Sequence, residues 1–242
     1  MTATGEVSPP AADAPWHTWV AWAVSTFADR LRVACSLSAE DSLLVQAVAE
    51  QVANVGCAPP TVFVLDTGRL HEESYHQLER LRLRYRLPFV SYVPDAIPLE
   101  SLLRRKGPLS FFASPEDRRE CCEVRKVEPL RRALTGASAW MTGQRRAQSP
   151  TRAVLTPLET DDRGMVKLNP LTFVDDATLW HEVETRGVPV HALHKAGYPS
   201  IGCAPCTRAV AAGDDPRSGR WWWESPETKE CGLHRRAQGE KP

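Results

Sequence analysis

Apolar residues fall into short runs separated by helix-like segments along the first half of the chain. Three runs have the length of buried strands: 32–35, 61–65 and 89–93. Apolar positions recur at helical spacing in three neighbouring segments: 16–30, 41–54 and a stretch that ends near 85. Strands that alternate with helices predict an α/β fold, in which a parallel twisted sheet carries helices on both faces.

The second half continues with shorter elements. A helix is expected from 118 to 127, where Pro129 should break or restart it. The remaining predictions are a strand, a hairpin and two helices. They span 139–142, then 154–159 with 165–168, then 175–186 and 191–197.

The predicted strands end in loops of small and charged residues. In parallel sheets, ligands bind beyond the carboxyl ends of the strands. The loop with Ser36 and Ser38 leads into a helix, an arrangement that presents backbone N–H groups to a phosphate. The same loop also fits an ordinary helix cap. A second loop, with Asp66, Gly68 and Arg69, leaves the same edge, and two converging loops favour a binding site more than either alone.

A third loop follows the strand predicted at 139–142. Gly143 allows the backbone to approach a ligand closely. Arg145, with Arg146 and Arg152 nearby, could hold a phosphate or sulfate through paired hydrogen bonds. We therefore expect an anionic ligand at this edge of the sheet.

Composition and charge narrow the class of protein. The chain has 242 residues, so one domain is the first expectation. Its formal net charge is zero, which provides no basic field to attract nucleic acid. No apolar run approaches the roughly 18 residues that span a bilayer. No secretory signal is visible, so we expect a reducing cytoplasm, where paired cysteines bind metal more often than they form disulfides.

The chain is expected to have three parts. Residues 1–15 are rich in Ala, Pro and Thr and are predicted to be flexible, and 16–212 should form the α/β domain. Residues 213–242 are predicted to be a mobile tail. Three consecutive tryptophans in this tail follow Arg217 and Arg220. They indicate either aromatic packing on the core or an anion clamp on a moving segment.

Four of the seven cysteines form two tight pairs, Cys121 with Cys122 and Cys203 with Cys206. Neighbouring residues on a helix diverge by about 100°. Both thiolates of the vicinal pair therefore reach one small ion only with strain, whereas a cubane offers them two different irons. Four cysteines suit a [4Fe–4S] cluster or a structural zinc ion, and the spacing leaves both open. Cys231 stands apart in the tail and is a candidate nucleophile.

Three further residues have weaker signals. Lys126 lies four residues after Cys122 on the same helical face, where its charge could meet an anionic ligand or only solvent. Cys35 is interpreted as a thiol in the core and Cys57 as a thiol in a loop.

Together, these residues are similar to those of the assimilatory sulfonucleotide reductases, and specifically of the cluster-containing adenylyl-sulfate reductases. The resemblance runs from about Ser36 to His234 and rests on motifs in a fixed order, which are more specific together than singly. The motifs are Ser36-Leu37-Ser38-Ala39-Glu40-Asp41, Asp66-Thr67-Gly68-Arg69-Leu70-His71, Cys121-Cys122 with Arg125-Lys126-Val127 and Pro129-Leu130, Thr142-Gly143-Gln144-Arg145-Arg146 with Gln148-Ser149, the Cys203 and Cys206 pair, Arg217 with Arg220-Trp221-Trp222, and Lys229-Glu230-Cys231-Gly232-Leu233-His234.

The resemblance implies an adenine nucleotide α-hydrolase-like fold, related to the PP-loop pyrophosphatases. It also implies reduction of adenosine 5′-phosphosulfate to sulfite and AMP, in sulfate assimilation and cysteine biosynthesis, with thioredoxin as transient electron donor. One [4Fe–4S] cluster would be held by the four paired cysteines. The substrate-binding residues would be Ser36, Ser38, Asp66, Gly68, Arg69, Lys126, Gly143, Arg145, Arg217, Arg220 and His234. Neither nucleic acid nor membrane is expected as a partner, and the sequence leaves open whether the chain forms a homo-oligomer.

The hypothesis for the chemistry is nucleophilic catalysis by Cys231. Its thiolate attacks the sulfur of the phosphosulfate, AMP leaves, and an S-sulfocysteine remains. A thioredoxin thiolate then attacks the sulfur–sulfur bond and releases sulfite. Lys229 and His234 are nearby cations that could lower the pKa of Cys231. Members of the family often carry a histidine where this chain has Arg118, so no specific role is carried onto that residue.

Three alternatives stay open at this point. One is the same reaction on the 3′-phosphorylated nucleotide, although the branch that uses it usually lacks the four cluster cysteines. The others are a PP-loop ATP pyrophosphatase and a zinc-stabilised interaction domain.

Overall fold

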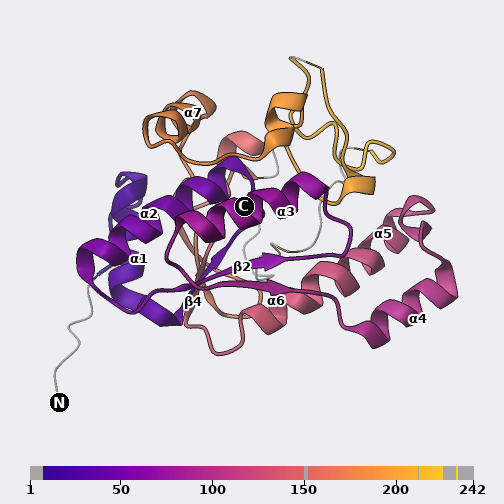
Figure 1. Ribbon diagram of the computed structural model, residues 1–242, viewed down its shortest axis with the longest axis horizontal. Helices are drawn as coiled ribbons and strands as arrows, with labels where there is room; N and C mark the ends of the chain where they lie inside the picture. The colour runs from indigo at the N-terminus through magenta and orange to yellow at the C-terminus, as the bar shows by residue number, and fades with distance from the viewer. Residues whose placement is uncertain (1–7, 150–151, 212, 226–232, 234–242) are drawn as a thin grey trace.

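A six-stranded sheet between helices forms the centre of the computed structural model (Figure 1). The structure describes residues 8–149, 152–211, 213–225 and 233. The predictions for Lys229, Cys231 and His234 lie outside these residues. No helix in the described ranges is long and apolar enough to cross a lipid bilayer.

The sheet is parallel except at one edge. Its strands are β1 Leu31–Ala34, β2 Thr61–Leu65, β3 Phe89–Tyr92, β4 Ala139–Met141, β5 Leu158–Thr160 and β6 Val166–Leu168. They lie in the order β3-β2-β1-β4-β6-β5, and β5 alone among these pairs antiparallel to its neighbour. The prediction of a parallel sheet is confirmed, as is the hairpin that forms β5 and β6.

The strands and helices lie close to the predicted ranges. The α-helices are α1 Trp16–Phe27, α2 Ala39–Val55, α3 Glu72–Arg84, α4 Ala96–Lys106, α5 Pro115–Cys122, α6 Glu128–Ala133 and α7 Asp176–Thr185. Short 3₁₀ turns cover Ala28–Arg30, Ser110–Phe112, Arg146–Gln148, Ala192–Ala196 and Ala204–Cys206. The sequence analysis missed α4, which buries only Leu102 and so has little of the apolar periodicity that reveals a helix.

Alternation along the strands separates two apolar layers. On β2, Val62 and Val64 face the larger core, which also contains buried residues of α1, α2, α3 and α7. Phe63 points to the opposite side, where it joins Leu130 of α6 and Trp140 of β4. Successive strand residues point to opposite faces, so the sheet is covered by helices on both, as the sequence predicted.

The helix that carries the vicinal cysteines does not break before Pro129. A π-helical turn, Glu123–Val127, joins α5 directly to α6, and the Glu128 N–H bonds back to the Glu123 carbonyl. Pro129 lies in the first turn of α6, where a missing N–H is tolerated. The extra residue in the π turn rotates the segments on either side of it relative to each other.

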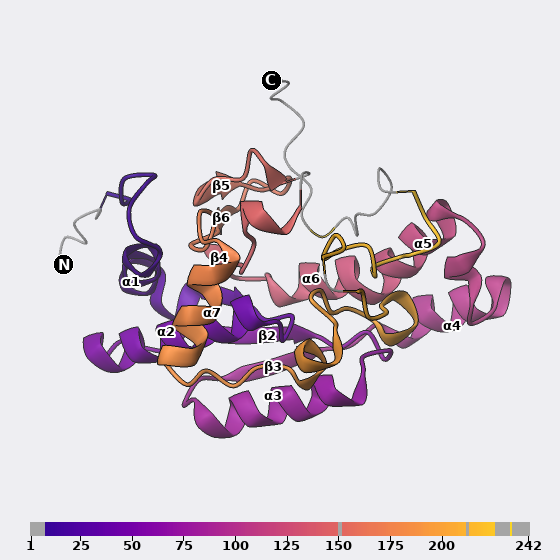
Figure 2. The ribbon, with the colours of Figure 1, turned by 90° about the horizontal axis from the view of Figure 1, so that it is seen from above.

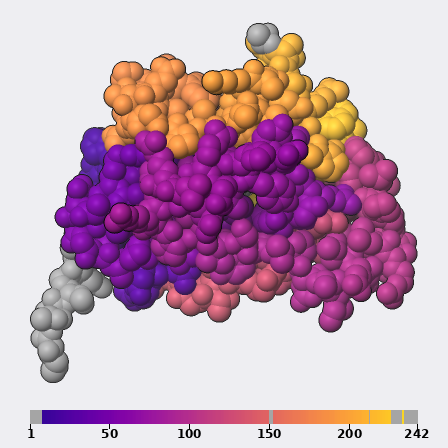
Figure 3. All heavy atoms as spheres, in the orientation of Figure 1, coloured from indigo at the N-terminus to yellow at the C-terminus, as the bar shows by residue number. Residues whose placement is uncertain are grey.

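The chain after β6 gathers along one side of the molecule. Figures 1 and 3 show this part, coloured orange to yellow, above α2 and α3, and Figure 2 shows it from above. Helix α7 packs on α2, and the 3₁₀ turn Ala192–Ala196 packs on α3. Trp221 is buried to 1% exposure, so the described part of the predicted tail includes a well-packed segment.

Candidate active site

A cavity of about 310 Å³ lies at the carboxyl ends of β1, β2 and β4. Small-molecule sites have volumes of roughly 300–1,000 Å³. Its walls include the loop after β1, one of the two loops predicted to converge at this edge, and the loop after β4, which was predicted to face an anionic ligand. Of the residues predicted to bind substrate, those that line it are Ser36, Ser38, Lys126, Gly143, Arg145, Arg217 and Arg220.

Asp66, Gly68 and Arg69 are not among the residues that line this cavity, although Thr67 and Leu70 of the same loop are. The Asp66 carboxylate accepts hydrogen bonds from the Gly68 N–H at 2.9 Å and the Tyr75 hydroxyl at 3.1 Å. Gly68 has a φ of +67°, a conformation that glycine adopts without strain. The loop turns there, and the Arg69 guanidinium stacks 4.8 Å from the centre of the Phe111 ring. Binding of substrate by these three residues stays a prediction.

Asp41 joins the two loops that line the cavity, a role that the sequence analysis missed. Its carboxylate accepts from the Ser36 N–H at 2.7 Å, the Ser36 hydroxyl at 2.5 Å and the Gly143 N–H at 2.9 Å. Burial raises the pKa of Asp41 to about 6, although these hydrogen bonds act in the opposite direction. Sequence alone recognises Asp41 only as part of a helix cap, because Gly143 is 102 residues away.

Arg145, in the loop after β4, forms a buried ion pair with Glu40 in the first turn of α2. Its guanidinium donates to the Glu40 carboxylate at 2.9 Å, the Asp176 carboxylate at 2.6 Å and the Val174 carbonyl at 3.0 Å. Burial raises the pKa of Glu40, but the Arg145 charge, together with hydrogen bonds from the backbone, Arg145 and Gln148, holds the pKa below its ordinary value. Arg145 therefore contacts several protein groups as well as lining the cavity.

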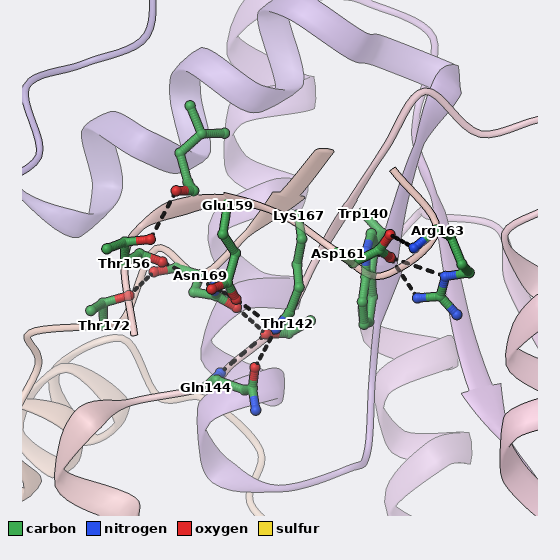
Figure 4. Close-up of polar contacts among 11 residues, drawn as sticks. Trp140, Thr142, Gln144, Thr156, Glu159, Asp161, Arg163, Lys167, Asn169 and Thr172 are labelled. Carbon is green, nitrogen blue, oxygen red and sulfur yellow. Dashed lines mark hydrogen bonds and ion pairs between the residues drawn. The ribbon is translucent and has the colours of Figure 1, made fainter. Parts of the chain in front are cut away.

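A polar network joins the end of β4 and the loop that follows it to β6 and the residue after β6 (Figure 4). The buried Lys167 ammonium donates to the side chains of Gln144 and Glu159, each at 2.7 Å. The Thr142 hydroxyl donates to the Asn169 side chain at 2.7 Å. Gln144 also lines the cavity, so this network fixes one of its walls.

The four paired cysteines line a second, smaller cavity. Cys121 and Cys122 come from the last turn of α5, Cys203 directly precedes the 3₁₀ turn Ala204–Cys206, and Cys206 ends it. All four side chains are buried. The structure thus brings together the two pairs that the sequence predicted would share one cofactor, from segments about 80 residues apart.

The described residues contain no cluster of three or more Cys, His, Asp or Glu at the separation of ligands to one ion.

Two buried hydrogen-bond donors that have no acceptor in the described structure indicate that a further group can bind in the smaller cavity. Arg125 and Trp221 both line it, and the Arg125 Nε and Trp221 Nε1 atoms are buried without a hydrogen-bond partner in the described structure. Buried donors nearly always have an acceptor. The sulfur atoms of a bound iron–sulfur cluster are such acceptors, so the residues present fit that cofactor.

Charges act differently on the two thiols of the second pair. Burial raises the pKa of Cys203, but the Lys126 charge and the Thr67 hydroxyl, 3.3 Å from its sulfur, hold the pKa below its ordinary value. Burial and the neighbouring Cys203 raise the pKa of Cys206 to about 12. The two thiols of this pair therefore differ in how readily they lose a proton.

Lys126, Cys203 and Trp221 line both cavities and so form their common wall. The Trp221 ring lies between two guanidiniums, with Arg118 at 4.5 Å and Arg220 at 4.6 Å from its centre. Trp221 has a φ of +43°, which is uncommon for a bulky residue.

Arg118, to which the sequence analysis gave no role, joins the cysteine-bearing helix to the tail. Its side chain is fully buried and donates to the buried Glu224 carboxylate at 2.5 Å. The Glu224 bond raises the pKa of Arg118 against the opposing effect of burial.

Other cavity-lining residues were not predicted from the sequence. They are Thr67, Ser74, Trp180, His194 and Ser200, among others. Thr67 directly follows the loop residue Asp66, so the rule for strand ends could have found it. The other four lie in the first turn of α3, on α7 and beyond, where no strand end draws attention to them.

The comparison with known proteins agrees with the sequence motifs. The phosphoadenosine phosphosulfate reductase domain family matches residues 30–209. An adenosine 5′-phosphosulfate reductase of Burkholderia cepacia is 47% identical over 85% of this chain and 81% of its own length. One from Allochromatium vinosum is 46% identical over 86% and 80%. A chloroplastic 5′-adenylylsulfate reductase 3 of Arabidopsis thaliana is 43% identical over 88% of this chain, which spans 47% of that longer protein.

Solved structures support the fold. A phosphoadenylyl-sulfate reductase from Candida auris, in a phosphate complex, superposes with a TM-score of 0.67 at 22% identity, over 82% of this chain and 91% of its own. The FMN adenylyltransferase of Candida glabrata, in complex with ATP, gives 0.57 at 14% identity, over 93% and 78%. These likenesses confirm the predicted adenine nucleotide α-hydrolase-like fold. By its family match, its relatives and its motifs, this chain belongs to the phosphoadenosine phosphosulfate reductase family.

Proposed function

We propose that this chain reduces adenosine 5′-phosphosulfate to sulfite and AMP, with thioredoxin as the electron donor. Its similar relatives are named as reductases of this nucleotide. The observation that carries the proposal is the common wall, because a nucleotide-sized cavity adjoins the site of the four cysteines. Lys126 lies in that wall, and Arg217 and Arg220 line the same cavity.

The proposed reaction uses Cys231 as the nucleophile. Its thiolate attacks the sulfate sulfur, the bond from that sulfur to the bridging oxygen breaks, and AMP leaves with the electron pair. One thiolate of thioredoxin then attacks the Cys231 sulfur and displaces sulfite. The second thioredoxin thiol resolves the mixed disulfide and restores the Cys231 thiol. Two electrons pass from the dithiol to the sulfonate sulfur.

Positive side chains make this attack feasible. A thiolate and a phosphosulfate repel each other, since both are anionic. Lys126, Arg217 and Arg220 offset the repulsion if they contact the phosphosulfate group in the cavity that they line. Each charge-assisted hydrogen bond is worth about 1.5–3 kcal/mol, which corresponds to roughly ten- to a hundred-fold in rate.

We also propose that Cys121, Cys122, Cys203 and Cys206 hold one [4Fe–4S] cluster. The shared cavity and the unpartnered donors of Arg125 and Trp221 support this choice. When bound, the cluster would crosslink α5 to the 203–206 turn and add negative charge close to Lys126. The residues that line the larger cavity would then orient the substrate, which lies across the common wall from the cluster.

Anaerobic purification followed by iron and sulfide analysis tests the cofactor. Four irons and four sulfides per chain are expected, and a colourless protein that contains zinc would overturn the assignment. Incubation with sulfur-labelled adenosine 5′-phosphosulfate tests the reaction, with a protein-bound label expected before thioredoxin is added. Cys231→Ser should abolish both label and sulfite while AMP binding and iron content persist.

The 3′-phosphorylated nucleotide is the second candidate substrate, because the family model and the Candida auris structure bear its name. The names of the more similar relatives favour the unphosphorylated form. Measurement of kcat/KM for both nucleotides decides between them. A higher value for the 3′-phosphorylated form would reverse our choice.

A further inference from the structure

A buried serine and a buried histidine meet at the wall of the nucleotide cavity. Ser74, in the first turn of α3, lines the cavity and is 2% exposed. His191, at the N-terminal end of the 3₁₀ turn Ala192–Ala196, is 0% exposed. The Ser74 hydroxyl oxygen and the His191 Nε2 atom are 2.9 Å apart. No motif in the sequence analysis includes this pair.

The backbone fixes the tautomer of His191. Its Nδ1 atom accepts a hydrogen bond from the Leu193 N–H at 3.3 Å, so Nδ1 carries no proton. Burial lowers the pKa of His191 to about 4, and the nearby His194 and His71 act in the same direction. The ring is therefore neutral near pH 7, and its proton lies on Nε2.

The direction of the Ser74 bond follows from that tautomer. The His191 Nε2–H donates, and the Ser74 oxygen accepts. His191 therefore cannot remove the Ser74 proton, which excludes an activated serine nucleophile of the Ser–His type. The Ser74 hydroxyl keeps its own hydrogen to donate, and an oxygen that already accepts one bond is a more polarised donor.

We propose that Ser74 is a further substrate-binding residue, which donates its hydroxyl hydrogen to an acceptor atom of the adenine nucleotide, and that His191 is the positioning residue that orients it. This proposal rests on the proposed function only in that the ligand is an adenine nucleotide. Such a ligand offers acceptors on its purine ring nitrogens, its ribose oxygens and its phosphate.

Isothermal titration of the full, iron-loaded chain with AMP and with adenosine tests the Ser74 contact. Ser74→Ala should weaken AMP binding about 3- to 10-fold, the loss typical of one neutral hydrogen bond. Equal losses for the two probes place the acceptor on the nucleoside, and a loss for AMP alone places it on the phosphate. Affinity for both probes within 1.5-fold of the parent would overturn the proposal.

Ser42→Ala is the matched control. Ser42 is also a fully buried helical serine, and it accepts a hydrogen bond from Gln77 of α3 at 3.2 Å. It is not among the residues that line the cavity. This variant should lose stability to a similar extent without losing affinity for AMP. A parallel loss of affinity in both variants would mean that Ser74 acts only through packing, which also contradicts the proposal.

Variants of His191 test its positioning role. His191→Gln keeps an N–H donor near the Nε2 position and should retain most of the affinity for AMP. His191→Leu should weaken AMP binding, and the double variant with Ser74→Ala should be no weaker than Ser74→Ala alone. Additive losses of AMP affinity in the double variant would contradict the proposal that His191 acts by orienting Ser74. Failure of the parent chain to bind AMP or release sulfite would instead contradict the proposed function, so the two failures are distinguishable.

Discussion

At the scale of single residues, one carboxylate sets the shape of the nucleotide cavity. The Asp41 carboxylate accepts hydrogen bonds from the backbone N–H groups of Ser36 and Gly143, which belong to loops after different strands. The sequence predicted that both loops would approach a ligand. It did not predict that Asp41 would tie them to each other, because a helix cap and an interloop bridge have the same local sequence.

Gly143→Ala tests this close approach. An added Cβ would lie 2.4 Å from the Asp41 Oδ1 atom and 2.9 Å from the Glu40 Cβ atom, so the loop must move. We expect AMP to bind at least about tenfold more weakly, a change of roughly 1.4 kcal/mol. Titration calorimetry measures the change.

Gly164→Ala is the control for this substitution. Gly164 lies in the hairpin turn with a φ of +76°, and an added Cβ would meet no other group within 4 Å. The variant should lose about 1 kcal/mol of stability from backbone strain and keep its affinity for AMP. If both glycine variants bind AMP as the parent does, the contact with Asp41 does not shape the site.

The raised pKa of Asp41 predicts a dependence of stability on pH. The folded-state pKa is about 6 and the ordinary value is 3.8, so the folded protein holds the proton more tightly than the unfolded chain does. Stability from this group is full below about pH 4 and falls as the pH rises through 6, by roughly 3 kcal/mol. Urea unfolding of the parent and Asp41→Asn between pH 4 and 8 measures it. The parent should lose stability relative to the variant as pH rises, and a constant difference would refute the assignment.

At the scale of elements, the helix with the vicinal cysteines shows what the sequence could predict. Its apolar periodicity located the helix, and the proline marked where the regular pattern changes. The π turn between them was not predictable, because it differs from an α turn by one hydrogen-bond partner rather than by residue type. The buried ion pair between Arg118 of this helix and Glu224 was not predictable either, since the two residues are 106 positions apart in the sequence.

Loss of Arg118 should destabilise the contact between α5 and the tail. Arg118→Ala leaves the Glu224 carboxylate buried without its partner, which typically costs about 3–5 kcal/mol. Lys106→Ala is the matched control, because Lys106 pairs with Asp117 of the same helix near the surface. That loss should stay below about 1 kcal/mol. Urea unfolding of both variants compares them, and equal losses would mean that burial of the Arg118 pair adds nothing.

At the scale of the whole molecule, the sequence predicted the sheet and the grouping of the cysteines. Strand periodicity and strand-end loops are local signals, so β1 to β4 and the edge of the sheet that holds the cavity were predictable. Side-chain partners such as Glu40 with Arg145, or Ser74 with His191, were not. They join segments more than 100 residues apart, and only the folded chain brings them together.

Loss of one cysteine of the second pair should affect both cavities. Cys206→Ser is expected to lower the iron content and to weaken AMP binding by about tenfold or more, since the turn that it anchors also supports the cavity wall. Cys57→Ser is the control, because Cys57 lines neither cavity, and it should leave both properties unchanged. Metal analysis and calorimetry provide the two readouts. Unchanged AMP affinity in an iron-free Cys206→Ser protein would show that the sites are independent.

The wall made by Lys126, Cys203 and Trp221 has an evolutionary consequence. Neither cavity can be altered alone through these residues, because each of the three side chains lines both cavities. If the proposed cluster occupies the smaller cavity, a substitution in this wall should change iron retention and nucleotide affinity together. Changes in either property are therefore expected to require paired rather than single substitutions.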